Sequence, residues 1–477
     1  MTDLADLDAR EARRLIGNKE ISPVALLESC IARTEAVNPV VNAMVATCYE
    51  RARKEANAAE RAVLVGDDLG LLHGLPVGVK DLQVTEGLRT TYGSLLYKDN
   101  VPEADERVIA AVRAEGGVVI GKTNTPEFGA GANTTNRVYG ATGNPFDPEL
   151  TSAGSSGGSA VAVATGMTPI ATGSDFGGSL RTPAAFCGVC GYRPSPGVVP
   201  NESRPVGLTP LSVVGPMARN VGDMALLLAA MVDFDKCDPF SGFVDPDLLD
   251  LPRQVDLATV HLAISEDLGA APVDDGIRKV FRERIAKMSS LFASVEDRKP
   301  DLGSVHEVFE ILRGVNFVAA HRQRLENHRD QLGPNVIDNT ERGLKFNAVD
   351  VAWAHVEQSK LYRRFLALFE DVDVLICPAA SVSPFPHEQP YVAEINGQEM
   401  PTYMRWLAIT YGLTMATPAV AVIPCGRDAE GLPFGIQVAG PNGSDALVLA
   451  VAQALECAMA GDPELARPLP DLKKLGA

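Results

Sequence analysis

Histidine, basic runs and long apolar stretches are scarce in this sequence, and each absence excludes a class of function. The seven histidines form neither His-x-x-x-His nor His-Glu-x-x-His, so the usual zinc-hydrolase motifs are missing and we expect no metal site. The formal net charge is −18 with no run of Lys or Arg, which argues against a nucleic-acid partner. No stretch of about 18 residues is free of Gly, Pro and polar breaks, so we expect no membrane-spanning helix and no membrane partner.

Cysteine is also too dispersed to build a disulfide framework. The eight cysteines are scattered along 477 residues, a pattern typical of reduced, partly buried thiols. Cys187-Gly-Val-Cys190 has metal or redox spacing but no second pair beside it, and we interpret it as two buried thiols. The first eight residues are acidic and lack the apolar core of a signal peptide. A cytoplasmic location is therefore expected.

What the sequence does contain is a repeated alternation of strand-like and helix-like segments. This alternation predicts an α/β fold with a large mixed or parallel sheet, covered by helices on both faces. We expect strands at residues 74–79, 117–120, 261–264, 372–378 and 419–424. We expect helices at residues 108–114, 221–232 and 445–460, and one that begins at Ser22-Pro23.

Two long segments are expected to be mainly helical. Residues 1–65 form an N-terminal helical segment, and residues 273–370 form a charged helical block. Strand patterns occur both before and after that block, so we interpret it as an insertion that covers the site of one domain spanning residues 1–477.

Two Ser/Gly-rich turns, at residues 151–159 and 173–181, are the most informative local feature. Serines in such turns are short nucleophiles beside free backbone N–H groups. Gly154-x-Ser156-x-Gly158 also matches the nucleophile elbow of α/β-hydrolases, which additionally need a downstream acid and then a His. Because the segment is so rich in Gly and Ser, this match arises readily by chance, and Ser156 stays an alternative nucleophile.

A second motif is formal only. Residues 116–123 fit Gly-x-x-x-x-Gly-Lys-Thr, the phosphate-binding P-loop pattern. The middle residues of this match are themselves the expected strand, and Pro126 soon interrupts any following helix. A strand is therefore favoured over a nucleotide site, and no cofactor is expected.

Lys80 follows the strand-like run at residues 74–79. Taken singly, a Lys after a strand usually reaches back to the surface, and a Ser in a Gly-rich turn usually caps a helix. The residue types alone therefore leave both structural and catalytic roles open for Lys80, Ser155 and Ser179.

The two turns together resemble the amidase signature family. Residues 153–159 read Ala-Gly-Ser-Ser-Gly-Gly-Ser, and residues 173–184 read Gly-Ser-Asp-Phe-Gly-Gly-Ser-Leu-Arg-Thr-Pro-Ala, in the order and at the separation of the family's motifs. Further matches lie at residues 74–81, 121–128, 140–146, 214–219 and 433–437. The resemblance covers nearly the whole chain and implies the amidase signature fold, with a large mixed central sheet, no metal and no cofactor.

The resemblance implies a Ser–Ser–Lys triad. Lys80 stands at the position of the family's general base, and Ser179 stands at the position of its nucleophile. Ser155 stands at the position of the bridging serine, which follows a cis peptide bond, here expected between Gly154 and Ser155. A Lys acts as a base only when it is neutral, which requires burial to lower its pKa. The apolar residues 75–79 supply that surrounding, while Asp81 opposes it unless strand alternation turns Asp81 to the other side.

The resemblance also implies which groups contact the substrate. The oxyanion donors are the backbone N–H groups of Phe176, Gly177, Gly178 and Ser179. The loop Gly129-Ala130-Gly131 resembles the family's loop that lines the substrate side of the active site, and Ser155 is expected to contact the substrate as well. Asp175 and Arg181 are expected to brace the turn by hydrogen bonds rather than to perform chemistry.

The expected activity is hydrolysis of carbon–nitrogen bonds in small amides through an acyl-enzyme, with aryl amides as one candidate class. Carbamate or ester hydrolysis, a non-enzymatic binding protein and a glutaminase-type amidotransferase subunit stay open as alternatives. Phe176 stands where many members have Thr, and residues 191–200 depart from the Lys-Pro-Thr-x-Gly-Arg pattern of amidotransferase A subunits. The pocket wall falls in residues 200–415, where Met404, Trp406 and Tyr411 could equally be pocket or core. A homodimer stays open beside a monomer.

Overall fold

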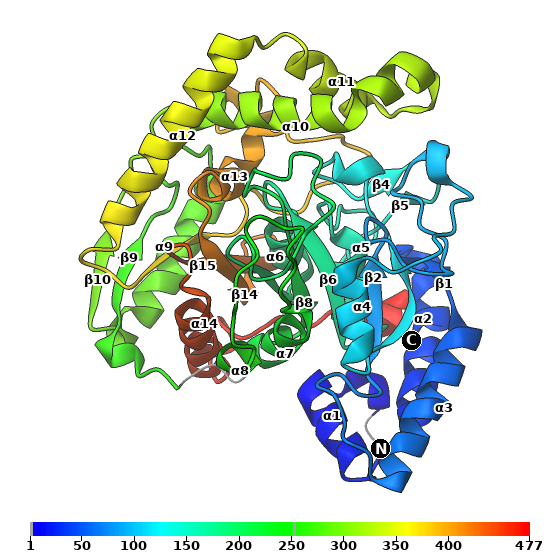
Figure 1. Cartoon of the computed structure of the whole chain (residues 1–477). Coiled ribbons are helices and arrows are strands. Elements are labelled where there is room, and N and C mark those ends of the chain that lie inside the picture. The colour runs from blue at the N-terminus through cyan, green and yellow to red at the C-terminus, as the bar shows by residue number, and fades with distance from the viewer. Residues whose placement is uncertain (1–2, 251–253) are drawn as a thin grey trace.

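An eleven-stranded mixed sheet runs through the centre of the molecule (Figure 1). The computed structural model describes residues 3–250 and 254–477. From one edge to the other, the sheet consists of β1 (Met44–Thr47), β3 (Val118–Thr123), β2 (Pro76–Lys80), β6 (Ile170–Asp175), β8 (Val213–Ala218), β7 (Cys190–Arg193), β14 (Ala419–Arg427), β15 (Pro433–Gly440), β11 (Val374–Pro378), β9 (His261–Ile264) and β10 (Ser294–Asp297).

The strand directions make the sheet mixed, as predicted. Strands β3, β2 and β6 are parallel neighbours, and so are β11, β9 and β10. The pairs from β6 across to β11 are antiparallel, as is β1 with β3. Two small ribbons lie outside the sheet: β4 (Thr135–Asn136) with β5 (Gly140–Ala141), and β12 (Glu394–Ile395) with β13 (Gln398–Glu399).

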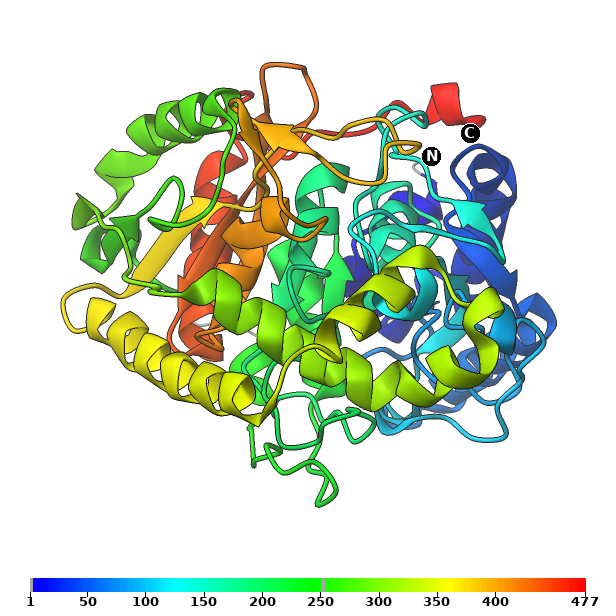
Figure 2. The same cartoon turned by 90° about the horizontal axis from the view of Figure 1, so that it is seen from above.

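Helices connect and cover these strands (Figures 1 and 2). They are α1 (Ala9–Gly17), α2 (Pro23–Val41), α3 (Tyr49–Val65), α4 (Arg107–Ala114), α5 (Gly157–Ala164), α6 (Arg181–Cys187), α7 (Val221–Met231), α8 (Asp247–Asp250), α9 (Asp275–Met288), α10 (Val305–His328), α11 (Pro334–Gly343), α12 (Ala348–Leu368), α13 (Ala408–Thr414) and α14 (Asp445–Met459). Helix α2 begins as predicted, because Ser22 Oγ accepts the N–H groups of Val24 and Ala25 and Pro23 occupies the first turn.

The glycines of β15 show that both faces of the sheet are covered. A Cβ atom at Gly435 would lie 3.1 Å from Ala185 of α6, whereas one at Gly440 would lie 2.8 Å from Val448 of α14. The two glycines are five positions apart in one strand, so they face opposite sides of the sheet. Helices α6 and α14 therefore pack against opposite faces, as the α/β prediction requires.

Both edge strands lie inside segments that the sequence predicts as helical. Strand β1 interrupts the N-terminal helical segment, and β10 interrupts the block at residues 273–370, so both expectations need correction there. Each strand has only four residues and is partly exposed. Short, half-polar edge strands give too few alternating apolar positions to stand out from neighbouring helices.

Helices α10, α11 and α12 form a layer over one side of the molecule, at the top of Figure 1. Helix α10 packs against α11, α12 and α13. Strand β9 precedes this layer in the chain and β11 follows it, and the two strands pair directly in the sheet. The layer therefore joins the sheet at neighbouring strands.

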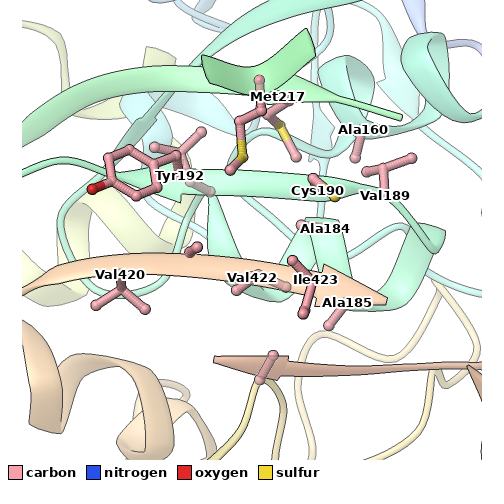
Figure 3. Close-up of a cluster of buried hydrophobic side chains, with 14 of the residues drawn as sticks. Ala160, Ala184, Ala185, Val189, Cys190, Tyr192, Met217, Val420, Val422 and Ile423 are labelled. Atoms are coloured by element: carbon pink, nitrogen blue, oxygen red, sulfur yellow. The ribbon is translucent and has the colours of Figure 1, made fainter. Parts of the chain in front are cut away.

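The hydrophobic core fills the space between the sheet and its helices. Helix α5 is buried along its whole length and contacts β2, β3 and β6. Its Gly158 permits this close approach, since a Cβ there would lie 2.2 Å from the backbone nitrogen of Asn124. Figure 3 shows the core around β7, β8, β14 and α6, with Tyr192, Met217, Val420, Val422, Ile423, Ala184 and Ala185 among its labelled residues.

Two expected absences concern metals and membranes. Within residues 3–250 and 254–477, no helix is long and apolar enough to cross a membrane. The same residues contain no cluster of three or more His, Cys, Asp or Glu side chains able to hold a metal ion.

Candidate active site

Parallel pairing of β2 with β6 brings Lys80 close to the second Ser/Gly turn. Lys80 is the last residue of β2, and β6 ends at Asp175, just before that turn. Parallel neighbours end at the same edge of a sheet, so both chain ends meet there. The first turn leads into α5, and the N–H of Ser156 donates to the carbonyl of Ser179 (3.1 Å). One hydrogen bond thus ties the two turns together.

Lys80 is fully buried and donates hydrogen bonds to serine hydroxyls. Its Nζ lies 2.8 Å from Ser155 Oγ, 2.8 Å from Ser156 Oγ and 2.9 Å from Ser174 Oγ. Burial lowers the pKa of Lys80 to about 7, although the carboxylate of Asp175 acts in the opposite direction. A substantial fraction of Lys80 is therefore a neutral amine near pH 7.

Asp81 does not oppose this effect. Its carboxylate accepts hydrogen bonds from the Thr91 N–H (3.0 Å) and the Thr91 hydroxyl (2.5 Å). Successive strand residues point to opposite faces, and the charge of Asp81 acts on Lys122 instead of Lys80. The alternation that the sequence analysis required is therefore present.

Ser155 and Ser179 line one cavity of about 160 Å³. Ser156 does not line it and is fully buried. The peptide bond between Gly154 and Ser155 is cis. The other residues of the cavity wall are Leu82, Phe128, Gly129, Ser174, Phe176, Pro205, Ser212, Arg313, Asn316, Phe317, Ala320 and His321.

The turn after β6 is braced by a buried charge cluster. The Arg181 guanidinium donates two bonds of 3.0 Å to the Asp175 carboxylate, and Arg193 donates to the same group at 3.1 Å. The carboxylate also accepts the N–H groups of Gly178 (3.0 Å) and Leu180 (3.1 Å). Asp175 and Arg181 thus fix the turn, as the sequence analysis expects.

This bracing changes the set of free N–H groups in the turn. The N–H of Gly178 already donates to Asp175, so it is not free to bind an oxyanion in this structure. The N–H groups of Phe176, Gly177 and Ser179 have no acceptor within the part of the chain that the structure describes. Three of the four expected donors are therefore available.

The two glycines of the turn face different surroundings. A Cβ at Gly178, where φ is +122°, would lie 2.2 Å from Thr410 Oγ1. At Gly177 it would meet the ring of Phe309 at 3.3 Å and Met404 at 3.4 Å. Gly178 is therefore required by the fold, whereas Gly177 leaves space on the side of α10.

The three residues of the loop at 129–131, predicted to line the substrate side, do not all line the cavity. Gly129 lines the cavity, and a Cβ there would lie 3.4 Å from Ser155 Oγ. The Ala130 methyl group belongs instead to a small apolar cluster with Leu325, Leu332 and Val336. Gly131 packs against Pro126, 2.9 Å from where a Cβ would lie. The side chain of Ala130 is therefore turned away from Ser155.

The aromatic residues left undecided by the sequence also separate. Trp406 is fully buried and packs against Phe186 and Phe385, so it is a core residue. Met404 lines a second cavity of about 270 Å³ beside α10. Tyr411 stacks on Phe309 with ring centroids 4.0 Å apart.

The competing motifs have structural explanations. Gly121, Lys122 and Thr123 are buried residues of β3 rather than a phosphate-binding loop. Cys187 and Cys190 are buried free thiols, and burial raises the pKa of both. The strand and buried-thiol interpretations are therefore the correct ones.

Several residues of this site carry no recognisable signal in the sequence. Ser174 is a direct partner of Lys80, yet in the motif it stood only as a spacer. Helix α10 contributes Arg313, Phe317 and His321 to the cavity wall, and no local pattern marked them. Burial and nearby arginines lower the pKa of His321 to about 3, so this side chain is a neutral wall residue and not a base at pH 7.

Comparison with known proteins gives consistent matches over almost the whole chain. Residues 25–449 match the family model described as Amidase. An acylamidase from Rhodococcus erythropolis is 32% identical over 458 residues, which cover 94% of this chain and 95% of that protein. The A subunit of glutamyl-tRNA(Gln) amidotransferase from Cyanothece sp. is 31% identical over 479 residues, covering 94% and 97%. The solved structure of a bacterial aryl acylamidase of the amidase signature enzymes has a TM-score of 0.89 at 27% identity over 96% of each chain.

Proposed function

This chain belongs to the amidase signature family, and from that premise we propose that it hydrolyses small amides through an acyl-enzyme on Ser179. It is an enzyme that cleaves amide carbon–nitrogen bonds, like its acylamidase and aryl acylamidase relatives. The observation that carries the proposed mechanism is the buried Lys80, whose Nζ contacts the hydroxyl of Ser155 (2.8 Å) beside the cavity that also contains Ser179.

In the proposed reaction, Ser179 Oγ attacks the carbonyl carbon and gives its proton to Ser155 Oγ, which passes its own proton to neutral Lys80 Nζ. The tetrahedral intermediate then breaks its C–N bond, and the amine leaves with a proton returned along the same route. Water adds to the resulting ester with the same base accepting its proton. The C–O bond to Ser179 then breaks, Ser179 Oγ takes a proton back through Ser155, and the carboxylic acid is released. The lowered pKa of Lys80 supports this role because a general base works best near the operating pH.

Ser179 is favoured over Ser156 as the nucleophile. Ser179 borders the cavity, whereas Ser156 is fully buried and accepts a hydrogen bond from Lys80 (2.8 Å). An elbow-type hydrolase would also need a His beside its serine. The hydrogen-bond partners of Ser156 Oγ are Lys80 and the carbonyl and N–H groups of Ser174, so Ser156 serves to hold Lys80 in place.

The oxyanion would be stabilised by the turn that carries Ser179. We assign this role to the N–H groups of Phe176, Gly177 and Ser179, which have no acceptor among the described residues. Gly178 contributes indirectly, because its N–H anchors the turn to Asp175. Preorganised donors of this kind typically contribute ~2.7–4 kcal/mol each to lowering the barrier.

The cavity supports a small substrate with an apolar, often aromatic, part. Its volume of about 160 Å³ is close to that of an engineered cavity of ~150 Å³ that binds benzene. Phe128, Phe176 and Phe317 contribute aromatic wall surface. Gly129 would contact the substrate, while Ala130 and Gly131 would only hold its loop. Aryl amides are therefore the first candidates, with carbamates and esters as alternatives.

Similarity to an amidotransferase subunit supports a second candidate, a glutaminase. A glutaminase would turn over free glutamine and act with a partner, whereas the hydrolase proposed above acts alone. Assays of glutamine, anilides, aliphatic amides and carbamates with the isolated chain separate the two. Three further predictions concern the whole protein. They are a single domain over residues 1–477, a cytoplasmic location, and a monomer or a homodimer as its oligomeric state.

The nucleophile can be identified by labelling with a serine-directed fluorophosphonate and locating the adduct by mass spectrometry. We expect the adduct on Ser179 and no adduct in Ser179→Ala. An adduct on Ser156, or labelling of Ser179→Ala at the wild-type rate, would sink the proposed mechanism.

A further inference from the structure

One buried arginine beside the active-site cavity has no counter-ion among the described residues. Arg313, in the middle of α10, is only 7% exposed. It lines both the cavity that contains Ser179 and the second cavity of about 270 Å³. Its guanidinium therefore lies between two spaces that a substrate can occupy.

The partners of Arg313 are all neutral. Nε donates to the side-chain oxygen of Asn339 (2.8 Å), and Nη2 donates to the Tyr403 hydroxyl (2.7 Å). Nη1 donates to no atom in residues 3–250 or 254–477. The nearby carboxylates are already engaged, because Glu310 pairs with Arg405 (3.4 Å) and Asp338 with Arg342 (2.9 Å). Arg313 thus keeps a donor available.

The other buried arginines of the described chain show how unusual this is. Each of them has an aspartate partner: Arg33 with Asp3 (2.7 Å), Arg181 with Asp175 (3.0 Å), Arg193 with Asp175 (3.1 Å), Arg204 with Asp238 (2.6 Å) and Arg219 with Asp8 (3.9 Å). Buried charges are normally paired, because removing them from water is costly. Arg313 is the exception within this part of the chain.

Aromatic rings surround the Arg313 guanidinium, but they stabilise its charge less than a counter-ion would. The Arg313 Cζ lies 4.6 Å from the Phe317 ring centroid and 5.8 Å from that of Phe176. Cation–π contacts contribute less than a desolvated carboxylate does. Phe176 also belongs to the turn that precedes Ser179. The Arg313 guanidinium therefore lies against the ring of Phe176, whose own N–H is one of the proposed oxyanion donors.

We propose that Arg313 binds a carboxylate of the substrate, so that the preferred substrates are small amides carrying a carboxylate a few bonds from the scissile bond. The inference rests on the proposed function, since it names the substrate class of the same site. Guanidinium and carboxylate match as a planar pair with two parallel hydrogen bonds. An incoming carboxylate would provide the missing counter-ion inside a desolvated, aromatic wall, where such a pair is strong.

Matched substrate pairs test this proposal on both sides of the amide. On the acyl side, the monoanilide of succinic acid is compared with butyranilide. On the amine side, 4-acetamidobenzoate is compared with 4-methylacetanilide. We expect wild-type enzyme to prefer the anionic member of at least one pair by about 100-fold or more in kcat/KM, because the uncharged member leaves the buried Arg313 guanidinium without a counter-ion.

Variants of α10 identify the residue responsible. Arg313→Met should abolish the preference, chiefly through KM of the anionic substrate, and Arg313→Lys should keep only part of it because an ammonium lacks the planar fork. Arg322→Met is the matched control, since Arg322 lies on the same helix and pairs with Glu326 at the surface (3.7 Å). It removes the same charge and should leave the preference intact.

The outcomes distinguish this proposal from the mechanism beneath it. Equal rates for both members of both pairs in wild-type enzyme would overturn the role of Arg313, even if no variant folds. Retention of the preference in a folded Arg313→Met would overturn it too. Failure of the proposed function looks different, because then no amide is hydrolysed and the fluorophosphonate does not label Ser179.

Discussion

Lys80 and Lys122 are both fully buried and lie on neighbouring parallel strands, yet their surroundings differ completely. Val79 pairs with Lys122 in the register of β2 and β3, so Lys80 and Lys122 point to opposite faces of the sheet. Lys80 contacts serine hydroxyls beside a cavity. Lys122 donates to the Thr85 hydroxyl (2.8 Å) and to the Gln83 carbonyl.

Nearby charges account for a modest difference in pKa. Burial lowers the pKa of Lys80 to about 7 and that of Lys122 to about 8, because the carboxylates of Asp81 and Glu106 act against burial at Lys122. Lys80 has only Asp175 nearby, and that carboxylate is already paired with Arg181 and Arg193. Burial alone therefore does not make a lysine a base. A lysine base also needs two further features. No free carboxylate lies beside it, and hydroxyl groups connect it to the substrate.

The largest expected effect separates the two lysines directly. Lys80→Met should lower kcat/KM by about 10⁴-fold or more while leaving the protein folded, because the base is lost and its volume is kept. Lys122→Met should instead destabilise folding by about 1–3 kcal/mol, since it leaves the buried Gln83 carbonyl and Thr85 hydroxyl without their donor. Anilide kinetics and chemical denaturation measure the two effects.

The opposite pattern would contradict the different roles of Lys80 and Lys122. Folded Lys122→Met should retain kcat within about tenfold of wild type, as expected for a residue outside the reacting groups. If instead Lys80→Met keeps wild-type kinetics, or if Lys122→Met alone is inactive while folded, the assignment of the base to Lys80 is wrong.

A second pair of variants tests the hydroxyl route. Ser155→Ala should lower kcat/KM by about 10²–10⁴-fold, the usual size of a proton-transfer contribution. Ser174→Ala removes a hydroxyl at nearly the same distance from Lys80 Nζ, 2.9 Å against 2.8 Å, and should cost about tenfold or less. Steady-state kinetics on one anilide compares them. Equal losses in both variants would mean that Ser155 has no special role in relaying the proton.

The sequence predicts one part of this site better than the other. Lys80, Ser155 and Ser179 follow from motifs of fixed spacing, and the bracing of the turn by Asp175 follows from the same motif. The helical block at residues 273–370 is expected to cover the site, but the residues of α10 that line the cavity could not be predicted, because they depend on how a helix more than a hundred residues away packs over the turn. Local periodicity carries no such information.

The fold is also predicted only in part, since the interior strands β6, β7, β8 and β15 are absent from the expected set. The interior strands β2, β3 and β11 are recognisable because they are short, apolar and bounded by Gly or Pro. Strands β1 and β10 are not, because they lie at the two edges of the sheet and are partly exposed. Their partners determine them more than their own residues do.

A smaller effect is expected from pH. Only neutral Lys80 can accept the proton, so kcat/KM should rise about tenfold per pH unit below a pKa of about 7 and level off above it. The value of kcat/KM falls at low pH because protonation of Lys80 below this pKa removes the base. A pH profile measured with a neutral anilide checks this, and a rate that falls as pH rises from 6 to 8 would contradict it.

The smallest effect is a predicted lack of change. Glu106→Gln removes a carboxyl group that acts on the pKa of Lys122 and not on that of Lys80. The pH profile of kcat/KM should therefore keep its wild-type midpoint in this variant. A shifted midpoint would show that the profile reports the Lys122 side of the sheet.

The most direct test is to measure the pKa of Lys80 itself by NMR with isotope-labelled lysine, using Lys80→Met to assign its signal. We expect this signal to titrate near pH 7, more than three pH units below an ordinary lysine at about 10.4. A Lys80 that stays charged up to pH 10 would contradict the claim that it is the base.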